Sequence, residues 1–108
     1  MQEIIIGVKT CRDEQNTLHS FQYSLLIRHI PAGRFAFEEY GVAVTHQNGD
    51  GDCVRIPGIT HSRTLIDNLI ALLMEHAVSP TELSYVVEDW VKENHLPQPE
   101  LQQVVDAV

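Results

Sequence analysis

Basic residues are scarce in this sequence. Its 108 residues include 7 Lys and Arg against 15 Asp and Glu, for a formal net charge of −8. Proteins that bind nucleic acids neutralise phosphates with clustered Lys and Arg, and anionic membrane surfaces attract the same clusters. The five arginines are instead scattered along the chain, at Arg12, Arg28, Arg34, Arg55 and Arg63. The sequence therefore predicts neither nucleic acid nor a membrane as a partner.

Long apolar runs and cysteine pairs are also absent. No stretch approaches the roughly 20 apolar residues that cross a bilayer. The apolar start at 4–6 is short and follows Glu3 rather than a basic segment, so it does not resemble a signal peptide. Cys11 and Cys53 are far apart and belong to no metal-binding pair. We expect two reduced thiols in a cytoplasmic protein.

Motifs that carry chemistry are missing as well. The sequence has no glycine-rich phosphate loop, no Gly-x-Ser-x-Gly elbow and no His-x-His or metalloprotease helix motif. We therefore expect no catalytic residue, no metal ligand and no cofactor. An enzyme stays open as an alternative because catalytic triads assemble in three dimensions rather than along the chain.

Two features invite a metal-binding interpretation. The 48–52 loop alternates Asn and Asp oxygens, but an EF-hand alignment puts His46 and Pro57 at its first and twelfth ligand positions, where neither fits. A hairpin turn is favoured there. Of the six histidines, His19 and His29 share the inward face of a predicted strand, and His76 falls within an apolar helical arc. We expect partly buried histidines bonded to backbone, with metal ligation or a pH-sensitive contact as alternatives.

The first half of the chain shows the alternation of β-strands. A length of 108 residues fits a single domain. Over 1–58, apolar and polar residues alternate in four segments separated by turn residues, with no helix between them, which predicts an antiparallel meander. The first strand should bury one face, formed by Ile4, Ile6 and Val8. Between Phe37 and Tyr40 the apolar parity changes, and this predicts a β-bulge near Glu38-Glu39.

The second half, 60–94, shows helical periodicity. Over 62–78 the apolar positions cover more than half of the helix circumference, which predicts a core helix that contacts both the sheet and a second helix. Ser79, Pro80 and Glu82 mark the start of that second helix as a capping box. Its narrower apolar stripe ends at Asn94, a predicted left-handed stop. The expected fold class is α+β, a meander followed by two amphipathic helices.

The last segment, 95–108, begins as a proline linker. Beyond it, we expect a short helical tail whose apolar side could contact a second copy of the chain, formed by Leu101, Val104, Val105 and Val108.

A run that opens at Ser79-Pro80 and continues as Val86-Val87-Glu88-Asp89-Trp90 resembles a known family. Further points of likeness are Tyr40-Gly41-Val42 and Ile56-Pro57. The family comprises short proteins of Gram-positive, often anaerobic bacteria, catalogued as a domain of unknown function. The resemblance extends from about Tyr40 to Val91 and supports the predicted fold. It implies no catalytic residues.

One polar strip of the second predicted helix is acidic. We expect it to be a candidate binding surface for a basic partner, because complementary charge steers association; it comprises Glu82, Tyr85, Glu88, Asp89 and Glu93. A solvated face without function is the plain alternative. The leading hypothesis is a small non-catalytic regulatory or protein-interaction module that binds another protein or itself. The alternative is a small enzyme or small-ligand binder that uses a crevice between sheet and helix.

Overall fold

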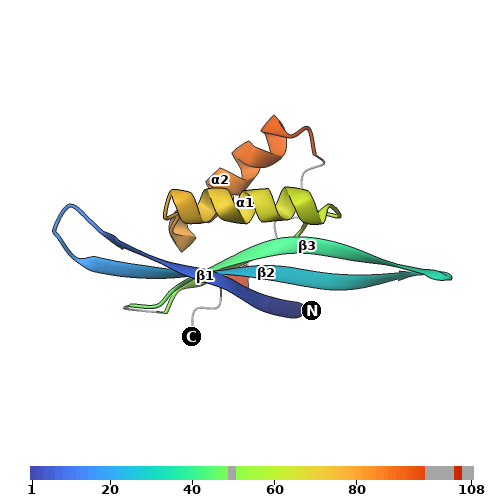
Figure 1. Cartoon of the computed structure of the whole chain (residues 1–108), viewed down its shortest axis with the longest axis horizontal. Coiled ribbons are helices and arrows are strands. Elements are labelled where there is room, and N and C mark those ends of the chain that lie inside the picture. The colour runs from blue at the N-terminus through green and yellow to red at the C-terminus, as the bar shows by residue number, and fades with distance from the viewer. Residues whose placement is uncertain (49–50, 97–103, 106–108) are drawn as a thin grey trace.

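The computed structural model describes residues 1–48, 51–96 and 104–105, and shows one antiparallel sheet with two helices on one face (Figure 1). The strands follow each other in space as along the chain: β1 (Gln2–Arg12), β2 (Leu18–Ala32), β3 (Phe35–His46), β4 (Cys53–Thr60) and β5 (Val104–Val105). The helices are α1 (Arg63–Glu75) and α2 (Pro80–Glu93). The predicted α+β fold is confirmed. Neither helix in these ranges is long and apolar enough to cross a membrane.

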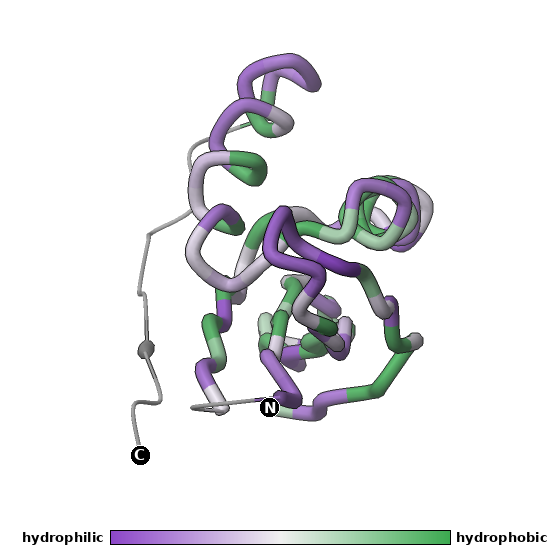
Figure 2. Tube along the Cα trace, turned by 90° about the vertical axis from the view of Figure 1, so that its left-hand side faces the viewer, coloured by the Kyte–Doolittle hydropathy of each residue, from purple (hydrophilic) through white to green (hydrophobic). Residues whose placement is uncertain are grey.

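The hydrophobic core lies between the sheet and the two helices, which stand on the same side of it (Figure 2). The sheet contributes fully buried side chains from its three central strands, Tyr23, Leu25, Val42, Val44 and Ile56. The helices contribute Ile66, Leu69, Leu73, Leu83, Val87 and Val91. Helix α1 packs across β1 to β4, and α2 packs on β3 and β4. The prediction that α1 packs on the sheet is confirmed, whereas the close contact predicted between α1 and the second helix is not found.

Both helices begin where the sequence predicts, but their ends differ in detail. The Ser62 hydroxyl caps α1 by accepting from the Leu65 amide at 3.2 Å. Ser79 precedes Pro80 at the start of α2 but makes no side-chain cap; its hydroxyl donates to Glu82 Oε1 at 2.8 Å and lies 2.9 Å from the Thr81 hydroxyl. The predicted capping box is therefore wrong. The left-handed residue after α2 is His95, with φ 55°, rather than Asn94.

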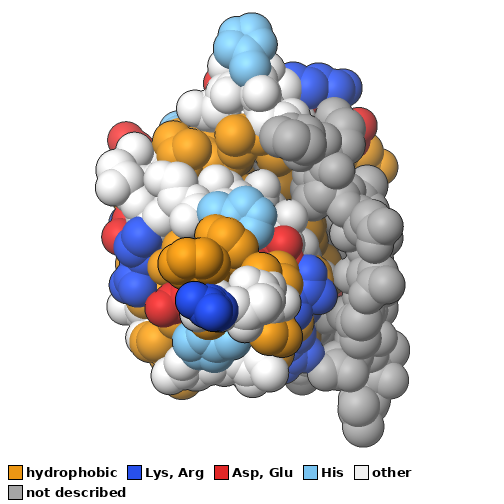
Figure 3. All heavy atoms as spheres, turned by 90° about the vertical axis from the view of Figure 1, so that its right-hand side faces the viewer, with side chains coloured by type: hydrophobic (Ala, Val, Ile, Leu, Met, Phe, Trp, Pro, Cys, Tyr) orange, Lys and Arg blue, Asp and Glu red, His pale blue; other side chains and the backbone are white. Residues whose placement is uncertain are grey.

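Strand β3 contains no bulge at Glu38-Glu39, so that prediction is wrong. Its register with β2 is unbroken from His46 to Phe35. The parity change is accommodated because Phe35 and Phe37 lie on a hairpin that projects beyond α1, where they are 73% and 52% exposed (Figure 1). Hydrophobic side chains gather at the surface of this end of the molecule (Figure 3). Burial of both parities was therefore never required.

The irregularity in this part of the sheet lies instead between β3 and β4. While β3 advances from Tyr40 to Val42, β4 advances from Thr60 to Ile56, so the extra residues belong to β4. Gly41 lies at this point, pressed against the backbone of the neighbouring strand. A Cβ on Gly41 would lie 2.2 Å from the Ile56 carbonyl oxygen.

Strand β1 forms as predicted but does not bury its isoleucines. Ile4, Ile6 and Val8 are 36%, 43% and 48% exposed. The register of β1 with β2 shifts between Ile5 and Gly7, which breaks the expected alternation. Helix α1 reaches this strand at Gly7, where the Met74 side chain fills the space that a Cβ would occupy. The edge strand is covered at its glycine, and its isoleucines stay accessible.

The C-terminal tail was predicted to be helical, and for Val104–Val105 this is wrong. These residues form β5, whose backbone pairs antiparallel with Val54 and Arg55 at the edge of β4. Leu101 and Val108 lie outside the described residues.

Candidate functional site

The exposed side of α2 carries the acidic strip that the sequence indicates. We call it the α2 acidic face and define it as Glu82, Tyr85, Glu88, Asp89 and Glu93. Three of its carboxylates are exposed, Glu88 is half-buried, and the Tyr85 side chain between them is 73% exposed. The opposite side of the helix is buried through Leu83, Val87, Trp90 and Val91. The structure thus brings all five predicted residues onto one accessible helix.

Little of this negative charge is compensated. Glu88 pairs with Lys92 at 3.7 Å, and Glu82 accepts a hydrogen bond from Ser79. Within residues 1–48 and 51–96, no ion pair involves Asp89 or Glu93. Both lie in the last two turns of α2, where the helix dipole disfavours negative charge.

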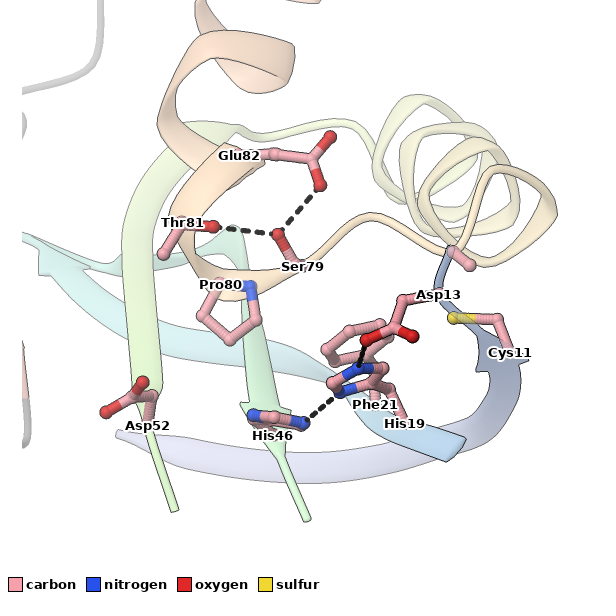
Figure 4. A pocket seen from close by; sticks show the side chains of 11 residues that line it. Cys11, Asp13, His19, Phe21, His46, Asp52, Ser79, Pro80, Thr81 and Glu82 are labelled. Atoms are coloured by element: carbon pink, nitrogen blue, oxygen red, sulfur yellow. Dashed lines mark hydrogen bonds and ion pairs between the residues drawn. The ribbon is translucent and has the colours of Figure 1, made fainter. Parts of the chain in front are cut away.

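A second candidate site is a pocket between the sheet and the start of α2 (Figure 4). Its volume is about 390 Å³. The sheet side provides Cys11, Asp13, His19, Phe21, His46 and Asp52, and the helix side provides Ala77, Ser79, Pro80, Thr81 and Glu82. The crevice expected for the small-ligand alternative therefore exists, with two histidines converging on it.

A chain of hydrogen bonds links three side chains along one wall of this pocket. Asp13 Oδ2 lies 2.7 Å from His19 Nε2, and His19 Nδ1 lies 3.1 Å from His46 Nε2 (Figure 4). An ionised carboxylate only accepts hydrogen bonds, so His19 Nε2 carries a proton. In the neutral ring His19 Nδ1 then accepts from His46 Nε2. The rings of both histidines also contact Phe21, with centroids 6.3 Å and 5.1 Å away.

The loop between β1 and β2 holds Asp13 in this position. Asp13 Oδ1 accepts hydrogen bonds from the Gln15 and Thr17 amides, both at 2.9 Å. The second oxygen is thereby aimed at His19. The hydrogen bond from His19, followed by that from the Thr17 amide, holds the pKa of the Asp13 carboxyl below its ordinary value. Asp13 therefore stays ionised and keeps the His19 tautomer fixed.

The remaining predictions on histidine and cysteine have mixed outcomes. His19 and His46 are partly buried, but they bond to side chains rather than to backbone. His29 and His76 are exposed, so the inward and core positions predicted for them are wrong. His29 lies on the projecting hairpin, and His76 caps α1 after its last turn. Both cysteines are free thiols, as predicted.

The 48–52 loop is described only in part, because residues 49 and 50 lie outside the described residues. Asn48 Oδ1 accepts a hydrogen bond from the Ser20 amide at 3.0 Å, which occupies one of the oxygens considered for calcium. Among the residues that the structure describes, no three His, Cys, Asp or Glu side chains stand close enough to enclose a metal ion.

Comparison with known proteins adds one match. A model described as a family of unknown function, DUF6514, matches residues 2–93, a longer span than the resemblance from Tyr40 to Val91. No curated protein and no solved structure matches the chain. The distribution among Gram-positive bacteria stays a prediction.

Proposed function

We propose that this chain, which belongs to the DUF6514 family of unknown function, is a small non-catalytic interaction module of the cytoplasm. Its partner is a protein with a basic surface, and the α2 acidic face is the surface that binds it. The observation that carries this proposal is Tyr85, whose side chain is 73% exposed in the middle of the acidic strip.

Two physical arguments support this choice of surface. Exposed carboxylates alone are common on protein surfaces. Tyrosine is enriched at protein interfaces because its ring buries a large area while its hydroxyl finds a polar partner. Asp89 and Glu93 add charge that the fold does not use, at a helix end that disfavours it. A basic partner would gain from both features, with charge steering the encounter and Tyr85 anchoring it.

Reversal of two charges tests the proposal. The double variant D89K/E93K should bind the partner about tenfold or more weakly, chiefly through slower association, because complementary charge raises the association rate. Affinity capture from the source organism with the wild-type chain identifies the partner. Binding of the purified partner is then measured against both chains at two salt concentrations.

A matched control separates this surface from net charge. The variant E14K/E75K changes the net charge equally, with both exposed glutamates on elements other than α2. It should retain wild-type affinity. A role for the α2 acidic face would be contradicted if both double variants bound the partner equally weakly. It would also be contradicted if neither variant lost affinity.

Self-association is the second form of the proposal. It assigns the apolar residues of the tail to contact with another copy, namely Leu101, Val104, Val105 and Val108. Light scattering should then give a dimer mass for the full chain and a monomer mass for a chain truncated after Pro97. A monomer in both cases would remove this form and leave the α2 proposal untouched.

A further inference from the structure

The two histidines of the pocket face each other through their ring nitrogens. His19 Nδ1 and His46 Nε2 are 3.1 Å apart. Histidine nitrogens bind Zn²⁺ at about 2.0–2.1 Å, so two of them on one ion at angles near 90–110° lie about 2.9–3.4 Å apart. The observed separation falls within this range. A metal ion could take the place of this hydrogen bond if the His46 proton moves to Nδ1 and both rings turn until their lone pairs meet at one point.

Asp13 prepares His19 for that role. Histidines that bind metals commonly donate their other ring N–H to a carboxylate, which fixes the tautomer and raises the basicity of the ligating nitrogen. His19 has this arrangement, since Nε2 donates to Asp13 and Nδ1 is left with its lone pair directed at His46. The Gln15 and Thr17 amides in turn hold the Asp13 carboxylate. The second sphere of a metal site is thus already assembled.

Two further side chains that could donate to a metal line the same pocket as His19 and His46. Cys11 lies directly across from His19 in the β1–β2 register, and both line the pocket. Asp52, the residue before β4, lines it as well. Imidazole suits Zn²⁺, Cu²⁺ and Ni²⁺, and a thiolate neighbour favours Zn²⁺ over Mg²⁺ or Ca²⁺. No third side chain among the described residues completes a set of ligands in this conformation.

We propose that His19 and His46 form a binding site for a divalent transition-metal ion, with Asp13 as the positioning residue. This gives the small-ligand alternative a defined chemical class, and it does not depend on the α2 acidic face. Two protein nitrogens with open positions make the site exchangeable, and the ion can accept further ligands from the pocket.

Zinc binding to the tag-free full chain tests the proposal. Competition of Zn²⁺ against a chromophoric chelator should show saturable binding of one ion per chain. His46→Gln should lose saturable binding, whereas His76→Gln, which removes an exposed histidine outside the pocket, should leave it unchanged. No saturable binding to the wild type, or equal loss in both variants, would overturn the proposal.

A second variant tests the role of Asp13 itself. Asp13→Asn keeps the oxygen that accepts from Gln15 and Thr17 but turns an amide donor towards His19 Nε2. The proton of His19 then moves to Nδ1, the nitrogen that would bind the metal. Zinc affinity should fall about 10- to 100-fold, and imidazole nitrogen shifts should report the reversed tautomer. Reversal of the tautomer without loss of affinity would contradict metal binding at His19.

Broadening of NMR resonances by a paramagnetic ion tests the site in the wild-type chain and therefore needs no variant that could fold poorly. Added Ni²⁺ should broaden the wild-type resonances of Phe21, His19 and His46 before those of His29 and His76. Broadening centred on any other histidine would overturn the assignment.

Discussion

Gly41→Ala is expected to destabilise the fold by about 3 kcal/mol or more, at the upper end of the cost of overpacking. A Cβ at this position would lie 2.2 Å from the Ile56 carbonyl oxygen and 2.6 Å from Pro57 Cα. Both are backbone atoms, so no rotamer change can relieve the clash. Strands β3 and β4 would have to separate where the core residues Val42 and Ile56 pair. Urea denaturation followed by circular dichroism measures the free energy of unfolding.

Gly33→Ala is the matched control for this substitution. Gly33 has φ 62° in the β2–β3 turn, and a Cβ there would meet nothing within 4 Å. Its expected cost is about 1 kcal/mol, from the left-handed conformation alone. A Gly41→Ala protein as stable as the Gly33→Ala protein would show that the two strands do not approach as closely as described.

Leu73→Ala should cost about 3–4 kcal/mol, which a small domain withstands only narrowly. Leu73 is 0% exposed in the part of α1 that packs on the sheet. Its truncation loses buried apolar area and leaves a cavity that the surrounding close-packed side chains cannot fill. Thermal and urea unfolding of the variant give the loss of stability.

Leu72 provides the neighbouring control on the same helix. It is only partly buried at the margin of the core, so Leu72→Ala should cost about 1–2 kcal/mol. The difference between the two variants reports which face of α1 meets the sheet. A larger loss at Leu72 than at Leu73 would require α1 to be turned on its axis.

Features set by neighbouring residues could be predicted from the sequence. The helix start at Ser79-Pro80 depends on the fixed φ of proline and its missing donor, and it lies where expected. The burial of α1 depends on helical periodicity, which is equally local. The capping box is wrong because Glu82 accepts from the Ser79 hydroxyl rather than from the Ser79 amide, and sequence spacing does not decide between these two donors.

Features set by distant contacts could not be predicted. The exposure of Ile4 and Ile6 depends on where α1 lies over the sheet. The change of parity in β3 requires a bulge only if Phe35 and Phe37 are buried with the rest of the strand. In fact the hairpin extends past the helices.

The pocket depends on register in the same way. His46 meets His19 because it pairs with Phe21 across β2 and β3, a match that turn lengths determine. Asp13 joins them only once the β1–β2 loop has folded back on the strand ends. The wide spacing of the six histidines in the sequence does not predict that His19 and His46 lie in contact. The helical periodicity of the five residues on α2, in contrast, predicts that they share one face.

The role of the α2 acidic face is tested most directly by mapping backbone amide chemical shifts of the full chain as the purified partner is added. The largest changes should fall on Tyr85, Asp89 and Glu93 and diminish with salt. Changes confined to the exposed edge of β1 or to the pocket around His46, with α2 unaffected, would contradict the proposed function.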